Sequence, residues 1–186
     1  MIDYARLDRS IRYFENEGIP SIELPWTVTK SVSEITKPDG KSEWEILGKN
    51  KVLVASGEQG FLYLYLKGFL PKGRYQGITP CFRDEPFDIT HTKYFIKNEI
   101  IITDEVNDIT LLWLVDLSKS FFEKELMMRV DIVKTEEGYD LEVGGIEIGS
   151  YGIRKCDYLE WIYGTACAEP RMSVVILKNK LNGVSY

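Results

Sequence analysis

The segment Asp140–Ile148 is the part of the sequence that most constrains the fold, because its pattern is typical of a tight β-hairpin. Apolar and polar residues alternate along it. The alternation is broken at Gly144–Gly145, a pair that tolerates the positive φ angles of a two-residue turn. The pattern therefore predicts two paired strands in which Val143 lies opposite Ile146.

The same hairpin collects acidic side chains on one face. Side chains alternate along a strand, so Asp140, Glu142 and Glu147 share the face that points away from the apolar residues. Glu142 would lie opposite Glu147, and like charges in that position destabilise a sheet unless a cation binds there. Mg²⁺ suits such a site, because it prefers carboxylate oxygens and often shares its coordination with substrate phosphates. The alternative is an ordinary solvated acidic face.

The composition predicts a single globular domain over residues 1–186. The chain is 44% hydrophobic and is large enough to bury a core. We expect no membrane segment and no signal peptide, because no apolar stretch is long enough. The three cysteines are far apart, which indicates a reducing, cytoplasmic location rather than a disulfide framework or a zinc site. A net charge of −6 argues against a broad nucleic-acid footprint, although a local basic patch could exist.

The order of expected elements is mixed. Helical spacing or capping predicts helices, with Gly18 as the C-cap of the first and Ser56 as the N-cap of the second. The expected helices are 4–17, 60–67 and 109–127, the expected strands are 19–24, 44–47, 51–55, 75–85 and 93–103, and 172–181 is a short helix or strand. Antiparallel strands followed by packed helices indicate an α+β domain.

A second group of polar residues lies on two of the predicted strands. Arg83 and Glu85 share one face of the first strand, and Phe95, Lys97 and Glu99 share one face of the return strand. A guanidinium group clamps phosphate with two hydrogen bonds, and an exposed ring offers a purine a surface to stack on. A strand ion pair and a core phenylalanine are the alternative interpretation.

Four segments, in order and with the right internal spacing, resemble the catalytic core of class II aminoacyl-tRNA synthetases. The resemblance is greatest to the lysine/aspartate/asparagine subgroup and to asparagine synthetases of that fold. Gly18–Pro25 resembles the first signature of the family, and Phe82–Glu99 resembles the second. Asp140–Arg154 resembles the stretch before the third signature, and Gly164–Arg171 resembles the third itself.

This resemblance implies an antiparallel sheet of six or seven strands flanked by helices, with ATP on its open face. Arg83 would hold the α-phosphate, and Phe95 would stack on the adenine. Arg171 would cover the adenine from the other side and reach the γ-phosphate. The only histidine, His91, would lie near the β- and γ-phosphates, although alone it reads as an ordinary loop residue.

The resemblance also implies sites for a metal and for the acid. Asp140 and Glu147 would hold Mg²⁺. The remaining assigned residues are Glu85, Lys97 and Glu99 on the nucleotide side, and Ser56, Glu58 and Arg154 around the amino acid. Two departures from the family pattern stand out. Pro170 precedes Arg171 and removes a backbone donor, and Tyr151 replaces a small residue, so we expect it to narrow the amino-acid pocket.

The expected activity is ATP- and Mg²⁺-dependent adenylation of an amino acid or a related small carboxylic acid, with an acceptor that need not be tRNA. Two alternatives stay open: a minimal or partial aminoacyl-tRNA synthetase, and a non-catalytic module that senses nucleotide or amino acid. The sequence predicts no anticodon-binding domain, and the first signature implies a homodimer.

Overall fold

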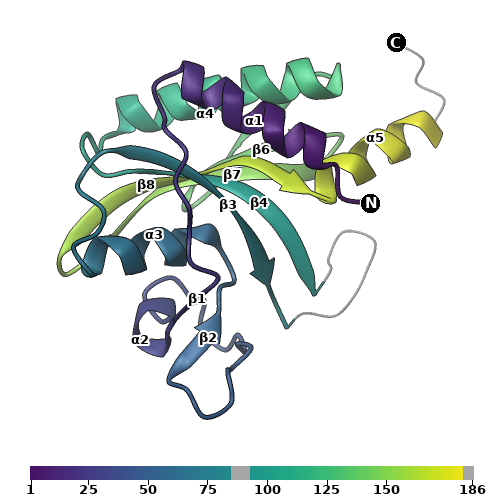
Figure 1. Ribbon diagram of the computed structural model, residues 1–186. Coiled ribbons are helices and arrows are strands. Elements are labelled where there is room, and N and C mark those ends of the chain that lie inside the picture. The colour runs from purple at the N-terminus through teal and green to yellow at the C-terminus, as the bar shows by residue number, and fades with distance from the viewer. Residues whose placement is uncertain (85–92, 182–186) are drawn as a thin grey trace.

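The computed structural model describes residues 1–84 and 93–181, in which a six-stranded antiparallel sheet lies between two layers of helices (Figure 1). The strand order is β3-β4-β8-β7-β6-β5. The strands are β3 (Arg74–Phe82), β4 (Tyr94–Ile102), β5 (Asp131–Lys134), β6 (Gly138–Val143), β7 (Ile146–Cys156) and β8 (Leu159–Glu169). A separate two-stranded sheet pairs β1 (Thr27–Thr29) with β2 (Lys51–Leu53). The predicted α+β class and antiparallel sheet are confirmed.

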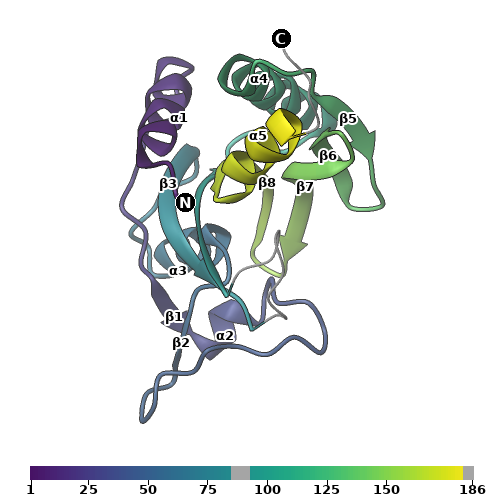
Figure 2. The same ribbon diagram turned by 90° about the vertical axis from the view of Figure 1, so that its right-hand side faces the viewer.

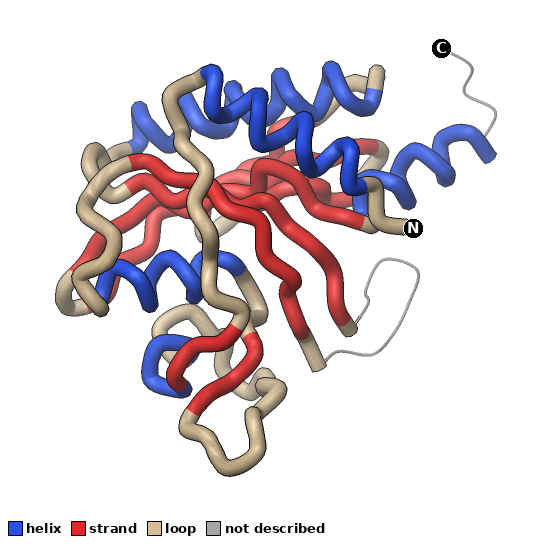
Figure 3. The backbone as a smooth tube through the Cα atoms, viewed as in Figure 1, coloured by secondary structure: helices blue, strands red, loops and turns tan. Residues whose placement is uncertain are grey.

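The helices divide between the two faces of the sheet. The first face is covered by α1 (Tyr4–Asn16), α4 (Asp108–Leu126) and α5 (Arg171–Leu181). The second face carries α3 (Gly57–Leu66), with β1, β2 and the short α2 (Lys30–Ser33) beyond it (Figure 2). The tube in Figure 3 shows α1 and α4 above the strands and α3 below them. None of the helices in residues 1–84 and 93–181 is long and apolar enough to cross a membrane.

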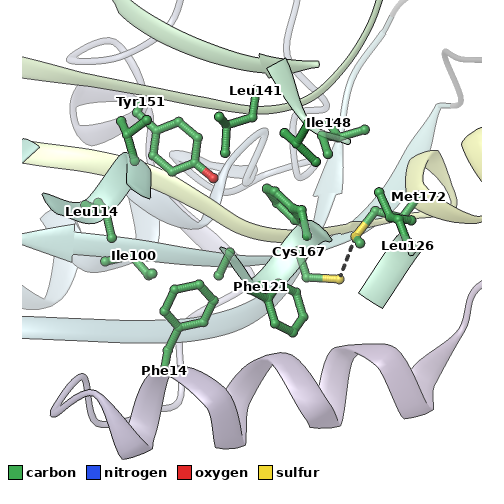
Figure 4. Packing of buried hydrophobic residues seen from close by; sticks show 14 of the residues in the cluster. Phe14, Ile100, Leu114, Phe121, Leu126, Leu141, Ile148, Tyr151, Cys167 and Met172 are labelled. Carbon is green, nitrogen blue, oxygen red and sulfur yellow. Dashed lines mark hydrogen bonds between the residues drawn. The ribbon is translucent and has the colours of Figure 1, made fainter. Parts of the chain in front are cut away.

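Each face has its own apolar core. The larger core joins α1, α4 and α5 to the sheet and includes Phe14, Phe121 and Tyr151, all at most 1% exposed (Figure 4). The smaller core, around Phe61 and Trp161, joins α3 to the second face. The smaller core covers only part of that face, and the rest of it borders a pocket.

Tyr151 corrects one expectation. Its ring packs in the larger core, where the hydroxyl donates to the Thr165 carbonyl, and it does not reach the amino-acid side of the molecule. The reason is strand parity: Ser150 and Arg154 point to the second face of the sheet, so Tyr151 points to the first. A methyl group at Gly164 would come within 2.7 Å of the tyrosine ring, so small neighbours make room for it.

The structure has the predicted helix ends and the predicted hairpin turn. Gly18 follows α1 with φ +80°, and the Ser56 hydroxyl caps α3 by accepting from the Glu58 N–H at 3.2 Å. Because Ser56 caps it, α3 begins at Gly57, three residues before the predicted start. The hairpin turns at Gly144–Gly145 as predicted, with Glu142 opposite Glu147.

Other predicted elements are wrong or incomplete. The segment 19–24 is not a strand; it contacts β3 through one bridge, at Ser21, and prolines at 20 and 25 cannot donate to a ladder. The segment 44–47 likewise makes a single bridge. β8 was not among the predicted strands, because a strand buried on both faces lacks the alternation that marks a half-exposed one. The last segment is the helix α5.

Candidate functional site

A pocket of about 390 Å³ lies on the second face of the sheet, in the part that α3 does not cover. Its walls come from β4, β7, β8, the start of α3, the start of α5 and the segment 33–43. Most of the predicted site residues line it together: Ser56, Glu58, Arg83, Phe95, Lys97, Glu99, Glu147, Arg154 and Arg171. Residues separated by more than a hundred positions in the chain therefore share one cavity.

Three predicted residues are not in the described wall. Asp140 lies one strand further out, opposite Ser150, which does line the pocket. Partial burial raises the pKa of Asp140 and the nearby Glu147 carboxylate raises it further, against a hydrogen bond from Ser150. Glu85 and His91 lie outside the described residues.

At the end of β3 a cation stacks on an aromatic ring. The Arg83 guanidinium carbon lies 5.0 Å from the centre of the Phe95 ring, and Arg83 Nε donates to the Ala55 carbonyl at 3.3 Å. The Phe82 N–H donates to the Val54 carbonyl at 2.8 Å, so the end of β3 is held beside the chain that leads into α3. The Arg83 guanidinium group and the Phe95 ring are thus held against each other at the edge of the pocket.

A buried carboxylate fixes the middle of the pocket floor. Glu99 is 7% exposed, and its carboxylate accepts from Lys97 Nζ at 2.8 Å, from Ser56 Oγ at 2.8 Å and from the Gly57 N–H. Burial alone would raise the pKa of Glu99, but the Lys97 ammonium and these donors hold it below its ordinary value. A methyl group at position 57 would lie 2.9 Å from Glu99 Oε2, so any residue larger than Gly57 would have to displace this carboxylate.

A second buried carboxylate lies at the start of α3. Glu58 Oε1 accepts from Trp161 Nε1 at 2.6 Å, and Glu58 Oε2 accepts from Arg154 Nη1 at 2.7 Å. Burial raises the pKa of Glu58, and Arg154 and Trp161 oppose that shift. Arg154 also donates to Glu137 at 3.1 Å and stacks on Tyr163 at 4.2 Å. The guanidinium charge is therefore already balanced by two carboxylates.

The acidic hairpin meets the start of α5. Arg171 Nη1 donates to Glu147 Oε1 at 2.7 Å, which joins the first residue of α5 to β7. Among the described residues, no cluster of three or more histidine, cysteine, aspartate or glutamate side chains could hold a metal ion unaided. Asp140 and Glu147 could supply two carboxylates. Burial raises the pKa of Asp140, and the charge of Glu147 adds to that shift, a repulsion that a bound cation would relieve.

Several residues in or next to the pocket carry no signal in the sequence that would predict their place there. Tyr163 of β8 lines the pocket, and Trp161, two residues earlier on the same strand, lies in the smaller core and donates to the pocket residue Glu58. The sequence pattern does not mark β8 as a strand, so it predicts neither residue. Glu169 closes β8 and is fully buried in an ion pair with Arg6 of α1, which no local signal predicts. Glu43 lines the pocket because the fold brings the segment after α2 against it, and no sequence pattern around Glu43 indicates this.

Comparison with known proteins identifies the fold. No protein-family model and no curated protein sequence matches the chain. Among solved structures, pyrrolysyl-tRNA synthetase from Desulfitobacterium hafniense superimposes with a TM-score of 0.71 at 14% identity, over 95% of this chain and 69% of that one. Seryl-tRNA synthetase from Pyrococcus horikoshii, complexed with ATP, gives 0.72 at 19% identity, over 94% and 51%.

A third structure agrees with these two. Cytoplasmic serine-tRNA ligase from Naegleria fowleri, in complex with AMP, gives a TM-score of 0.69 at 16% identity, over 93% of this chain and 47% of that one. The chain spans about half the length of these two seryl enzymes. These three neighbours are pyrrolysyl and seryl enzymes, so the lysine/aspartate/asparagine subgroup stays a prediction. The described chain has the fold of the catalytic core of class II aminoacyl-tRNA synthetases.

Proposed function

We propose that this protein activates an amino acid or a related small carboxylic acid by adenylation with ATP, in a Mg²⁺-dependent reaction. The observation that carries the proposal is the convergence of Arg83, Phe95 and Arg171 on one open face of the sheet, next to two buried, partnered carboxylates. Two of the structural neighbours were solved with ATP or AMP, which supports a nucleotide as the ligand of this face.

The nucleotide would use the ring and the two arginines. Phe95 offers a surface on which adenine can stack, and Arg83 beside it supplies charge for the α-phosphate. Arg171 is paired with Glu147 and would turn from that carboxylate toward the γ-phosphate. By resemblance, His91 assists near the β- and γ-phosphates, and Glu85 helps to position the nucleotide.

Asp140 and Glu147 are the residues that would hold Mg²⁺, with nucleotide phosphates completing its ligands. When bound, the ion neutralises charge on the phosphate oxygens and on the leaving pyrophosphate. The chain itself contributes two carboxylates on neighbouring strands and an arginine that already balances one of them.

The acid would lie at the other end of the pocket, against Ser56, Glu58 and Arg154. Arg154 is bonded to both Glu58 and Glu137, so we propose that it orients Glu58 and does not meet an acidic substrate side chain. The substrate carboxylate would attack the α-phosphorus, and pyrophosphate would leave. Such a reaction depends on positioning and charge stabilisation more than on a proton-transfer base.

The acceptor of the activated acid belongs to the same proposal. The structural neighbours are tRNA ligases, which makes tRNA one candidate. The net charge of −6 favours a smaller acceptor without a polyanionic backbone. We also propose that the protein acts in the cytoplasm, from its cysteine usage, and that it is a homodimer, from the resemblance. A non-catalytic sensor is the second candidate, and Pro170 beside Arg171 favours it.

Exchange of labelled pyrophosphate into ATP tests the activity directly. With ATP, Mg²⁺ and a mixture of amino acids, the protein should exchange label. Arg83→Ala should lower the rate by roughly a hundredfold or more, because it removes charge stabilisation at the α-phosphate. Arg74→Ala is the matched control: Arg74 begins β3, whereas Arg83 directly follows its end, and Arg74 likewise stacks on a ring, that of Trp113 at 5.2 Å, but outside the pocket.

The other outcomes separate the alternatives. Measurable ATP binding without exchange for any acid would favour the sensor and overturn the adenylation proposal. A mobility shift with bulk tRNA, followed by transfer of the acyl group to tRNA, would identify the protein as a tRNA ligase. Acyl transfer to a small amine but not to tRNA would support the smaller acceptor.

A further inference from the structure

One oxygen of the Glu43 carboxylate, in the pocket wall, has no hydrogen-bond donor among the described residues. It lies on the segment between α2 and β2, and its side chain is 10% exposed. Its Oε2 accepts from Lys37 Nζ at 3.3 Å, while its Oε1 is buried with no hydrogen-bond partner among the described residues. Lys37 is shared, because it also donates to the exposed Glu34. Glu43 is therefore poorly supplied with donors for a buried acid.

Glu58, a pocket carboxylate at the start of α3, already has its donors. Both oxygens of Glu58 have partners, Trp161 and Arg154. The pocket segment 33–43, which ends at Glu43, is bound to α3 at its first residue. Gln59 Nε2, next to Glu58 in the chain, donates to Ser33 Oγ at 2.8 Å. A donor that enters the pocket thus meets one carboxylate that is occupied and one that is not.

We propose that Glu43 accepts a hydrogen bond from a nitrogen of the activated acid, and that this acid carries an amine or amide group besides its α-amino group. The inference rests on the proposed function and names the substrate class of the same pocket. A buried acceptor discriminates strongly, because a substrate without the donor leaves it unpaired. An acid with an apolar or acidic side chain would leave Glu43 unpaired or place a second negative charge beside it.

Paired substrates test the inference in the pyrophosphate-exchange assay. Lysine is compared with norleucine, ornithine with norvaline, and glutamine with glutamate, each with the wild-type protein, ATP and Mg²⁺. At least one nitrogen-bearing acid should exchange roughly a hundredfold faster than its partner. Glu43→Ala should reduce that preference by about tenfold or more, while Glu43→Gln, which keeps the size of the side chain, should reduce it less for the amide substrate.

Glu45→Gln is the matched control, since Glu45 lies two residues from Glu43 on the same segment but is exposed and does not line the pocket. It should leave the preference unchanged. Circular dichroism checks that each variant is folded. If Glu43→Ala does not fold, the substrate preference of Glu43→Gln for the amine substrates is compared with that of the wild type instead. Exchange that is equally fast with the apolar or acidic partners, or a preference that survives both Glu43 variants, overturns the inference and leaves the proposed function standing. No exchange with any acid overturns both.

Discussion

Replacing Lys97 with methionine should destabilise the fold in a way that depends on pH. Lys97 Nζ lies 2.8 Å from Glu99 Oε1, and both side chains are largely buried, 14% and 9% exposed. Removing one partner of a buried ion pair leaves an uncompensated charge, which costs about 3–5 kcal/mol. Ser56 and Gly57 still donate to Glu99, so we expect about 2–4 kcal/mol at neutral pH.

The pH dependence follows from the direction of the pKa shift. The folded-state pKa of Glu99 is lowered in the wild type, so its contribution to stability is full above the ordinary glutamate pKa of about 4.3 and is lost as pH falls through the lowered value. In Lys97→Met, burial without the ammonium raises that pKa. At acidic pH the variant's Glu99 becomes protonated and no longer carries an unpaired buried charge. The difference in free energy of unfolding between the wild type and Lys97→Met should therefore shrink as the pH falls.

Urea unfolding at about pH 7 and about pH 4 measures both free energies of unfolding. Lys119→Met is the control: its pair with Glu123 on α4 is more exposed, and such pairs contribute about 0.2–1 kcal/mol. The double variant Lys97→Met/Glu99→Gln should recover about 1–3 kcal/mol relative to the sum of the single variants. A loss for Lys97→Met that is equal at both pH values, or no larger than that of Lys119→Met, would refute the reasoning.

Three further substitutions or treatments test the packing around the site. Gly57→Ala should displace Glu99, because the new methyl group would lie 2.9 Å from its carboxylate. The variant should exchange pyrophosphate more slowly and lose about 1–3 kcal/mol of its free energy of unfolding. An unchanged exchange rate would contradict this. Gly164→Ala should destabilise by a similar amount through its contact with Tyr151, measured by thermal unfolding, and an unchanged midpoint would argue against the tight packing. Burial raises the pKa of the Cys81 thiol to about 12, so a thiol reagent near neutral pH should modify Cys81 only after denaturation. Peptide mapping separates Cys81 from the partly exposed Cys156, and rapid labelling of Cys81 in the folded protein would disprove its burial.

Much of the site could be predicted because its residues sit in regular strands. Phe95, Lys97 and Glu99 alternate along β4, and the structure brings all three to one pocket. The hairpin register around Gly144–Gly145 was also predictable, since the turn fixes which residues face each other. For these elements two local facts, strand parity and turn geometry, were enough.

Other features depended on contacts between distant segments. The face of the sheet on which Tyr151 lies depends on β7 continuing through this residue, which the hairpin pattern alone does not show. That face belongs to the larger core, so the ring lies away from the pocket proposed for the amino acid. The partners of Arg154 depend on the fold, because Glu58 and Glu137, from two other segments, both bind its guanidinium. Neither partner is visible from the residues that flank Arg154.

By itself the sequence determined the antiparallel hairpin, the capped helices and the set of charged and aromatic residues available to a nucleotide. These depend on backbone preferences and on alternation over a few residues, and both are local. Only the tertiary structure decided which charges neutralise one another and which carboxylate, Glu43, is left short of donors. The physical reason is that burial and pairing depend on segments that meet only when the sheet is assembled.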